Sequence, residues 1–138
     1  MNTKLFLQEK NILTETVNSL NKNILNCLTI IGTAKDAKTM LEGYSNMAEY
    51  IEGYYWVIEK ISVLRDFVEG RGKQYKQLEQ FVKEFSEELW GIEIHLIGRQ
   101  KECREKNRQK ETDILGKRIE ELIVIIYTVE HLLQKNPA

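Results

Sequence analysis

Two histidines are the side chains best suited to proton transfer or metal binding, because imidazole changes its charge near neutral pH. They are His95 and His131. A helical di-metal site commonly places a glutamate three residues before each histidine ligand. This sequence has Ile92 and Thr128 at those two positions, so neither histidine predicts a metal or catalytic site.

Glutamates form a second candidate, since carboxylate oxygens are the ligands that Mg²⁺ prefers. They are Glu84, Glu87, Glu88, Glu120 and Glu121. The segment Lys117–Leu122 resembles part of a helix in the all-α nucleotide pyrophosphohydrolases, which bind magnesium with carboxylates on facing helices. This resemblance implies a metal-dependent nucleotide pyrophosphohydrolase as a third functional hypothesis. The aspartate that those families carry three residues after the glutamate is absent, because Ile123 and Val124 stand there.

Two cysteines, Cys27 and Cys103, lie 76 residues apart without a CxxC pair. No histidine lies at zinc-finger spacing, so two free thiols are expected rather than a disulfide or a zinc site. The sequence also lacks a glycine-rich phosphate loop, and no serine has a histidine at a spacing typical of nucleophilic catalysis. We therefore expect neither enzyme activity nor a cofactor.

The composition favours one all-α domain covering residues 1–138. Hydrophobic residues make up 42% and charged residues 30% of the chain, with one proline and eight glycines, which leaves little material for strands. A formal net charge of −1 gives no overall attraction to nucleic acid or to an anionic membrane. Because the sequence has neither a signal peptide nor a bilayer-spanning apolar run, we expect a cytoplasmic protein without a membrane partner.

Apolar residues at alternating three- and four-residue steps predict four long helices. The clearest stripe lies in residues 36–69: Met40, Tyr44, Met47, Ile51, Tyr54, Ile58, Ile61 and Val68. It continues through Gly43 and Gly53, which we interpret as points of close helix contact. The other helices are expected at 3–31, 73–97 and 112–135. The expected fold is an up-down-up-down four-helix bundle.

Several residues predict where these helices begin and end. Asp36 is suited to cap the second helix, and the two glycines of Glu69–Gly72 predict the turn that follows it. Thr112 or Asp113 is the expected cap of the fourth helix, and Pro137 prevents that helix from continuing.

The charged segment 98–112 is predicted either as a connection or as an extension of the two helices around it, because nothing in it strictly breaks a helix. Arg99–Arg118 holds eight basic and four acidic residues, a net charge of +4. The candidate contacts for nucleic acid or for an acidic protein partner are Arg99, Lys101, Arg104, Lys106, Arg108 and Lys110. No aromatic residue lies in this stretch to stack on a base.

The helix at 36–69 is acidic on the side opposite its apolar stripe, except at three large apolar residues. They are Trp56, Val63 and Phe67. Exposed aromatic residues are frequent anchors of protein interfaces. We therefore predict a protein-binding surface with these anchors and with Glu52, Glu59 and Lys60 at its rim. The width of the apolar faces also predicts a homodimer.

These observations favour a small non-enzymatic protein that binds another protein, as an inhibitor, adaptor, immunity factor or assembly factor. The alternative is a nucleic-acid-associated regulator that uses the basic segment 99–118. Richness in Asn, Lys, Ile and Glu is typical of low-GC bacteria and of their phages and mobile elements, which suggests that kind of source.

Overall fold

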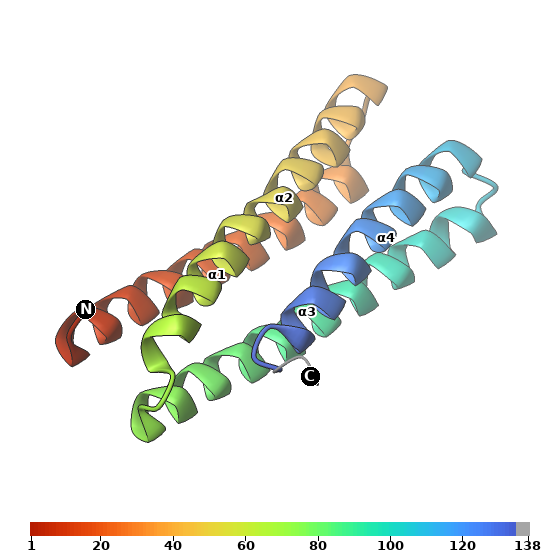
Figure 1. Ribbon diagram of the computed structural model, residues 1–138. Helices are drawn as coiled ribbons and strands as arrows, with labels where there is room; N and C mark the ends of the chain where they lie inside the picture. Colours follow the sequence, from red (N-terminus) through yellow and green to blue (C-terminus); the bar gives the residue numbers. More distant parts are fainter. Residues whose placement is uncertain (135–138) are drawn as a thin grey trace.

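The computed structural model describes residues 1–134 and shows four α-helices and no strand in that range (Figure 1). They are α1 (Thr3–Thr33), α2 (Ala37–Val68), α3 (Gly72–Glu105) and α4 (Gln109–His131). Successive helices run in opposite directions, so the N-terminus, the α2–α3 turn and the end of α4 lie at one end of the molecule. The predicted all-α, up-down-up-down four-helix bundle is confirmed.

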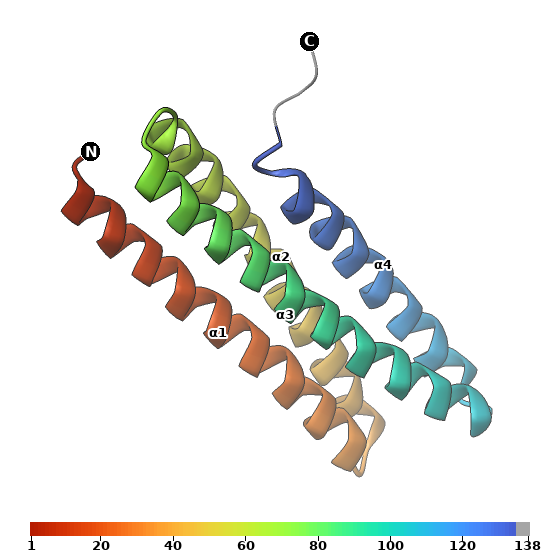
Figure 2. The same cartoon turned by 90° about the horizontal axis from the view of Figure 1, so that it is seen from below.

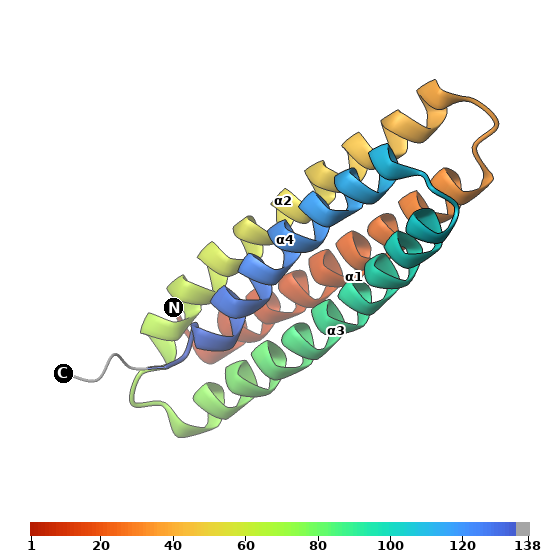
Figure 3. The same cartoon turned by 90° about the vertical axis from the view of Figure 1, so that its right-hand side faces the viewer.

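The helices form two antiparallel hairpins, α1/α2 and α3/α4, which pack against each other. Figure 2 shows α1 beside α3, and Figure 3 shows α2 beside α4. Helices α2 and α3 approach each other across the bundle, whereas no Cα atom of α1 lies within 8 Å of one of α4 in the described residues. The short α2–α3 turn therefore joins helices that lie diagonally opposite each other.

Two hydrogen bonds tie α2 to α4 along their length. The Tyr44 hydroxyl donates to Glu111 Oε1 at 3.2 Å, and Arg65 Nη1 donates to the Leu132 carbonyl oxygen at 2.8 Å. Both pairs are 67 residues apart in sequence, so the two helices run parallel with a constant offset.

The predicted start and end of α2 are confirmed by local contacts. The Asp36 carboxylate accepts a hydrogen bond from the Thr39 amide at 2.7 Å, which satisfies one of the free amides at the start of α2. Gly70 has a φ of +76°, the left-handed conformation that glycine adopts without strain, and the chain reverses there.

Of the two predictions for segment 98–112, the extension of the flanking helices is confirmed, so the predicted boundaries at residues 97 and 112 are wrong. Helix α3 continues to Glu105 instead of ending near residue 97, and α4 begins at Gln109 instead of residue 112. This extension packs on α2, since Cys103 is only 1% exposed and the Tyr44 hydroxyl of α2 donates a hydrogen bond to Glu111. Helix α4 ends at His131, and the predicted end at residue 135 lies outside the described residues, as does Pro137.

The predicted cap of α4 is wrong for the same reason. Arg108 stands at the cap position, and its side chain makes no capping hydrogen bond. Thr112 lies inside the helix, where its hydroxyl donates to the Arg108 carbonyl oxygen at 2.9 Å.

The predicted stripe of α2 lies in the core. Met47, Tyr54, Ile61 and Val68 follow one another at seven-residue steps and have no exposed side-chain surface. The interpretation of its two glycines is also confirmed, because both face α1 closely. A Cβ atom at Gly43 would lie 2.7 Å from Ile31 Cγ1, and one at Gly53 would lie 2.9 Å from Leu20 Cδ2.

Candidate protein-binding surface

Helix α2 exposes two of the three predicted anchor residues. Trp56 is 42% and Val63 is 57% exposed, on the side of the helix opposite its buried line. The ammonium group of Lys60 lies 5.6 Å from the centre of the Trp56 ring, a cation–π contact that holds the indole against the helix surface. The two residues are seven positions apart and therefore project in the same direction.

Phe67 does not belong to this exposed surface, and its predicted place on the outer face is wrong. Its ring centre lies 5.8 Å from that of Phe6 in α1, and the guanidinium of Arg71 covers it at 4.5 Å. Phe67 lies fourteen residues after Gly53, on the line of α2 that faces α1. The Phe67 side chain therefore fills the contact between α1 and α2.

Helix α1 adds two apolar residues that the sequence interpretation overlooked. Leu5 and Ile12 are 41% and 46% exposed and lie seven residues apart. The contacts of Phe6 with Phe67 and of Leu20 with Gly53 fix an antiparallel register in which Ile12 lies level with residue 61. Ile12 is thus close to the height of Val63, whereas Leu5 is level with residue 68, at the end of the surface away from Trp56. We call the surface formed by Leu5, Ile12, Trp56 and Val63 the α1/α2 face.

The rim of the α1/α2 face is acidic. Glu52 and Glu59 are exposed, and neither forms a salt bridge within residues 1–134. Lys60, the third predicted rim residue, is exposed and lies over Trp56. The surface therefore offers an apolar centre beside uncompensated negative charge.

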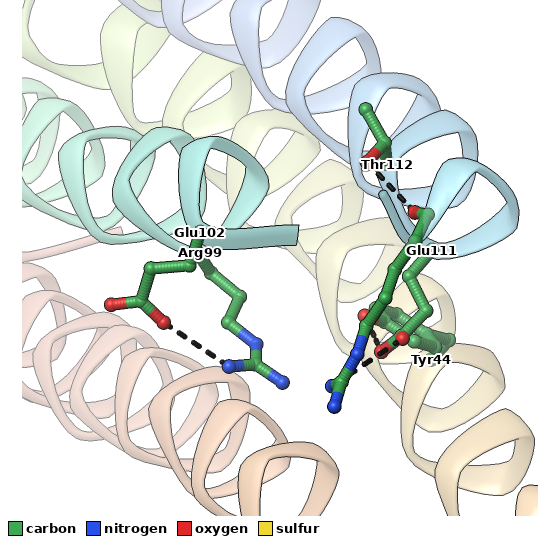
Figure 4. A network of polar contacts seen from close by, with 6 residues as sticks. Tyr44, Arg99, Glu102, Glu111 and Thr112 are labelled. Carbon is green, nitrogen blue, oxygen red and sulfur yellow. Dashed lines mark hydrogen bonds and ion pairs between the residues drawn. The ribbon is translucent and has the colours of Figure 1, made fainter. Parts of the chain in front are cut away.

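The basic segment 99–118 is partly neutralised by its own acidic residues (Figure 4). Arg99 Nη1 lies 3.2 Å from Glu102 Oε2, and Arg108 Nη1 lies 3.7 Å from Glu111 Oε2. Glu111 also accepts the hydrogen bond from Tyr44, so this network joins the α3–α4 turn to α2. The four other predicted basic contacts remain exposed: Lys101, Arg104, Lys106 and Lys110.

The interior of this network disfavours charged forms of its weak acids. Burial raises the pKa of the Tyr44 hydroxyl, and the negative charge of Glu111 raises it further. Burial also raises the pKa of the Cys103 and Cys27 thiols, both of which are buried and free, as predicted. Such thiols are poor nucleophiles because little thiolate forms near neutral pH.

The glutamates considered as metal ligands point to different neighbours. Glu88 accepts a hydrogen bond from Asn21 of α1 at 3.0 Å, whereas Glu121 forms a salt bridge with Arg118 on its own helix. Among residues 1–134, no group of three or more His, Cys, Asp and Glu side chains is placed to hold a metal ion. Neither histidine lies inside the bundle, since His95 and His131 are both exposed.

Comparisons with protein-family models, with curated proteins and with solved structures find no match to this chain. None of the four helices in the described part of the chain combines the length and the apolar character needed to span a membrane.

Proposed function

We propose that this protein acts by binding another protein through the α1/α2 face, as an inhibitor, adaptor, immunity factor or assembly factor, and not as an enzyme. The observation that carries the proposal is Trp56, a tryptophan 42% exposed and braced by Lys60 on a well-packed helix. A pre-positioned aromatic side chain loses little conformational freedom on binding and gains a large buried area.

The apolar centre is sufficient to anchor a partner. Trp56 and Val63 lie on one line of α2, with Ile12 beside Val63 on α1. Covering a large apolar side chain contributes on the order of 1–2 kcal/mol, since each is already half buried. Three such side chains in one patch are a typical hot-spot cluster.

The acidic rim defines the chemistry of the partner. Residues 36–69 carry a net charge of −4, and Glu52 and Glu59 lie next to the anchors. A complementary protein would bring an apolar patch bordered by lysine or arginine, and opposite charges would accelerate its association. A nucleic-acid backbone would be repelled from this face.

The test compares capture by the wild-type protein with capture by Trp56→Glu and Val63→Asp, using extract of the source cells and then the purified partner. Binding of that partner should fall at least about tenfold in each variant, while thermal stability is retained because both side chains are exposed. Ile94→Asp is the matched control, since Ile94 is 67% exposed on α3, away from this face. A partner bound equally by all four proteins would refute the proposal.

The basic segment supports the alternative, nucleic-acid-associated regulation, less well. Arg99 and Arg108 are already held by Glu102 and Glu111, which leaves four exposed cations at the end of the bundle. A mobility-shift titration with single- and double-stranded oligonucleotides at several salt concentrations tests it, because phosphate contacts give a steep salt dependence.

A further inference from the structure

The hairpin of α3 and α4 carries a second apolar surface, on its outer side. Trp90 and Ile97 of α3 are 41% and 43% exposed, and Ile123 and Tyr127 of α4 are 42% and 66% exposed. We call these four residues the α3/α4 face. Isolated exposed apolar residues are ordinary, but four large ones on adjacent helices form a patch.

The seam between the two helices shows that the four residues share one side. Gln100 Nε2 donates to the Thr112 carbonyl oxygen at 3.2 Å and lies 3.2 Å from the Cβ position of Gly116. Ile97 is one turn before Gln100, and Ile123 lies seven residues after Gly116. Both therefore border the seam on the solvent side.

Charged residues lie on the same lines of α3 and α4 as the four apolar residues, and their sign differs between the two helices. On α3, Lys83, Trp90, Ile97 and Arg104 repeat every seven residues, so the apolar pair has a cation at each end. On α4 the corresponding charges are all negative: Asp113, Glu120 and Glu130. None of these five charged residues forms a salt bridge in the described part of the chain.

We propose that the α3/α4 face is the interface of a homodimer, with α3 of each copy packed on α4 of the other. A two-fold axis parallel to the helices places α3 of one copy opposite α4 of the other. Each residue keeps its position along the direction of the helices. The basic line of each copy then meets the acidic line of its mate. This interface lies on a different part of the molecule from the α1/α2 face and is independent of the function proposed there.

The turn between α3 and α4 determines which residues meet. Residues equally distant from Asn107, the middle of the turn, lie at the same height. Trp90 is therefore level with residue 124 and faces Ile123 and Tyr127 of the second copy. Lys83 is level with residue 131 and faces Glu130.

The other end of the face follows the same rule. Arg104 lies within about one helical turn of Asp113 of the second copy, a distance that an arginine side chain spans. Aromatic contacts thus lie in the central part of the interface, where Glu120 is level with residue 94 at their border, and opposite charges lie at its two ends.

The charge pattern excludes the other face-to-face arrangement. A two-fold axis perpendicular to the helices would set α3 against α3, placing Lys83 opposite Arg104 and Glu130 opposite Asp113. Like charges facing each other oppose association.

The area of the α3/α4 face also suits a dimer. The 21 residue steps from Lys83 to Arg104 are about 30 Å long, and two helices side by side are about 20 Å wide. The footprint of the face is therefore on the order of 600 Å², compared with about 800 Å² per partner in a standard interface.

The test measures the mass of the full chain in solution by sedimentation, with Tyr127→Asp to disrupt the centre. The wild-type protein should be a dimer at micromolar concentration, and Tyr127→Asp a monomer with retained helicity, since Tyr127 is 66% exposed. Val63→Asp, on the α1/α2 face, is the control and should remain a dimer.

A charge-exchange experiment tests the pairing itself. Lys83→Glu and Glu130→Lys should each weaken self-association about tenfold, because each homodimer then contains two like-charged contacts. Mixing the two variants should restore a heterodimer, in which both contacts again join opposite charges. A monomeric wild-type protein, or a mixture that associates no better than its components, would overturn the proposal.

Discussion

The Tyr44 side chain links α2 to the buried start of α4 through a hydrogen bond to Glu111. It is 2% exposed and its hydroxyl donates to Glu111, which is itself only 7% exposed. Tyr44→Phe should lower the free energy of unfolding by about 1–3 kcal/mol, because one oxygen of a buried carboxylate loses its donor. Chemical denaturation measures the change, and Tyr55→Phe, at a site 44% exposed, should change it little. Equal stability of the two variants would show that water replaces the hydroxyl.

Glu93 gives the protein a pH dependence of its own. Its side chain, on α3, is 8% exposed, and burial raises the pKa of its carboxyl above the ordinary value of about 4.3. The folded state then holds the proton more tightly than the unfolded state, so stability falls as the pH rises through the folded pKa.

Replacing this carboxylate should remove that penalty. Glu93→Gln should be more stable than the wild type at pH 7, and the difference should shrink as the pH falls toward the ordinary value. Thermal melts across this pH range at one protein concentration measure it, with Glu87→Gln, an exposed site on the same helix, as the control. A variant less stable than the wild type at pH 7 would show that the carboxylate has a favourable partner.

At the scale of the helices, the approach of α1 to α2 depends on the absence of a side chain at Gly43. A Cβ there would lie 2.7 Å from Ile31 Cγ1, a branched side chain with few alternatives. Gly43→Ala should cost roughly 1 kcal/mol net, because overpacking costs about 1–3 kcal/mol while the helix propensity of alanine returns up to about 1 kcal/mol.

Gly91 provides the matched control for this prediction. It lies inside α3, and a Cβ added there would have no neighbour within 4 Å. Gly91→Ala should therefore stabilise the protein by about 0.5–1 kcal/mol through helix propensity alone. Urea denaturation of both variants decides the matter, since opposite signs are expected and equal signs would contradict the close contact at Gly43.

At the scale of the whole molecule, charge is unevenly distributed between α2 and the end of the bundle around the α3–α4 turn. Residues 36–69 carry a net charge of −4, and residues 99–118 carry +4. The proposed dimer uses opposite charges at both ends of its interface, so its dissociation constant should rise severalfold between about 0.1 M and about 1 M NaCl, as the screening length falls from about 10 Å to about 3 Å. Sedimentation at both salt concentrations tests this, and tighter association at high salt would show that the charges oppose dimerisation.

The number of helices, their apolar lines and the sharp turn after α2 were predictable from local sequence patterns. These features depend on neighbouring residues: the stripe through Met47, Tyr54 and Ile61 repeats with the period of a helix, and Gly70 permits the reversal. The exposure of Trp56 and Val63 was predictable for the same reason, because the side opposite a buried line is exposed unless another element covers it.

Which surfaces remain free and where α3 ends depend on how the helices pack together. Phe67 is covered by Phe6, 61 residues earlier in the chain, and no local pattern reveals that contact. Segment 98–112 contains good helix formers throughout, so its boundaries depend on the packing of Cys103 and Glu111 against the other hairpin. The α3/α4 face likewise exists because α3 and α4 pair along one seam, which brings Trp90 near the height of Ile123 and Tyr127. Helical periodicity is a local property, whereas the pairing of helix faces depends on contacts between residues far apart in the sequence.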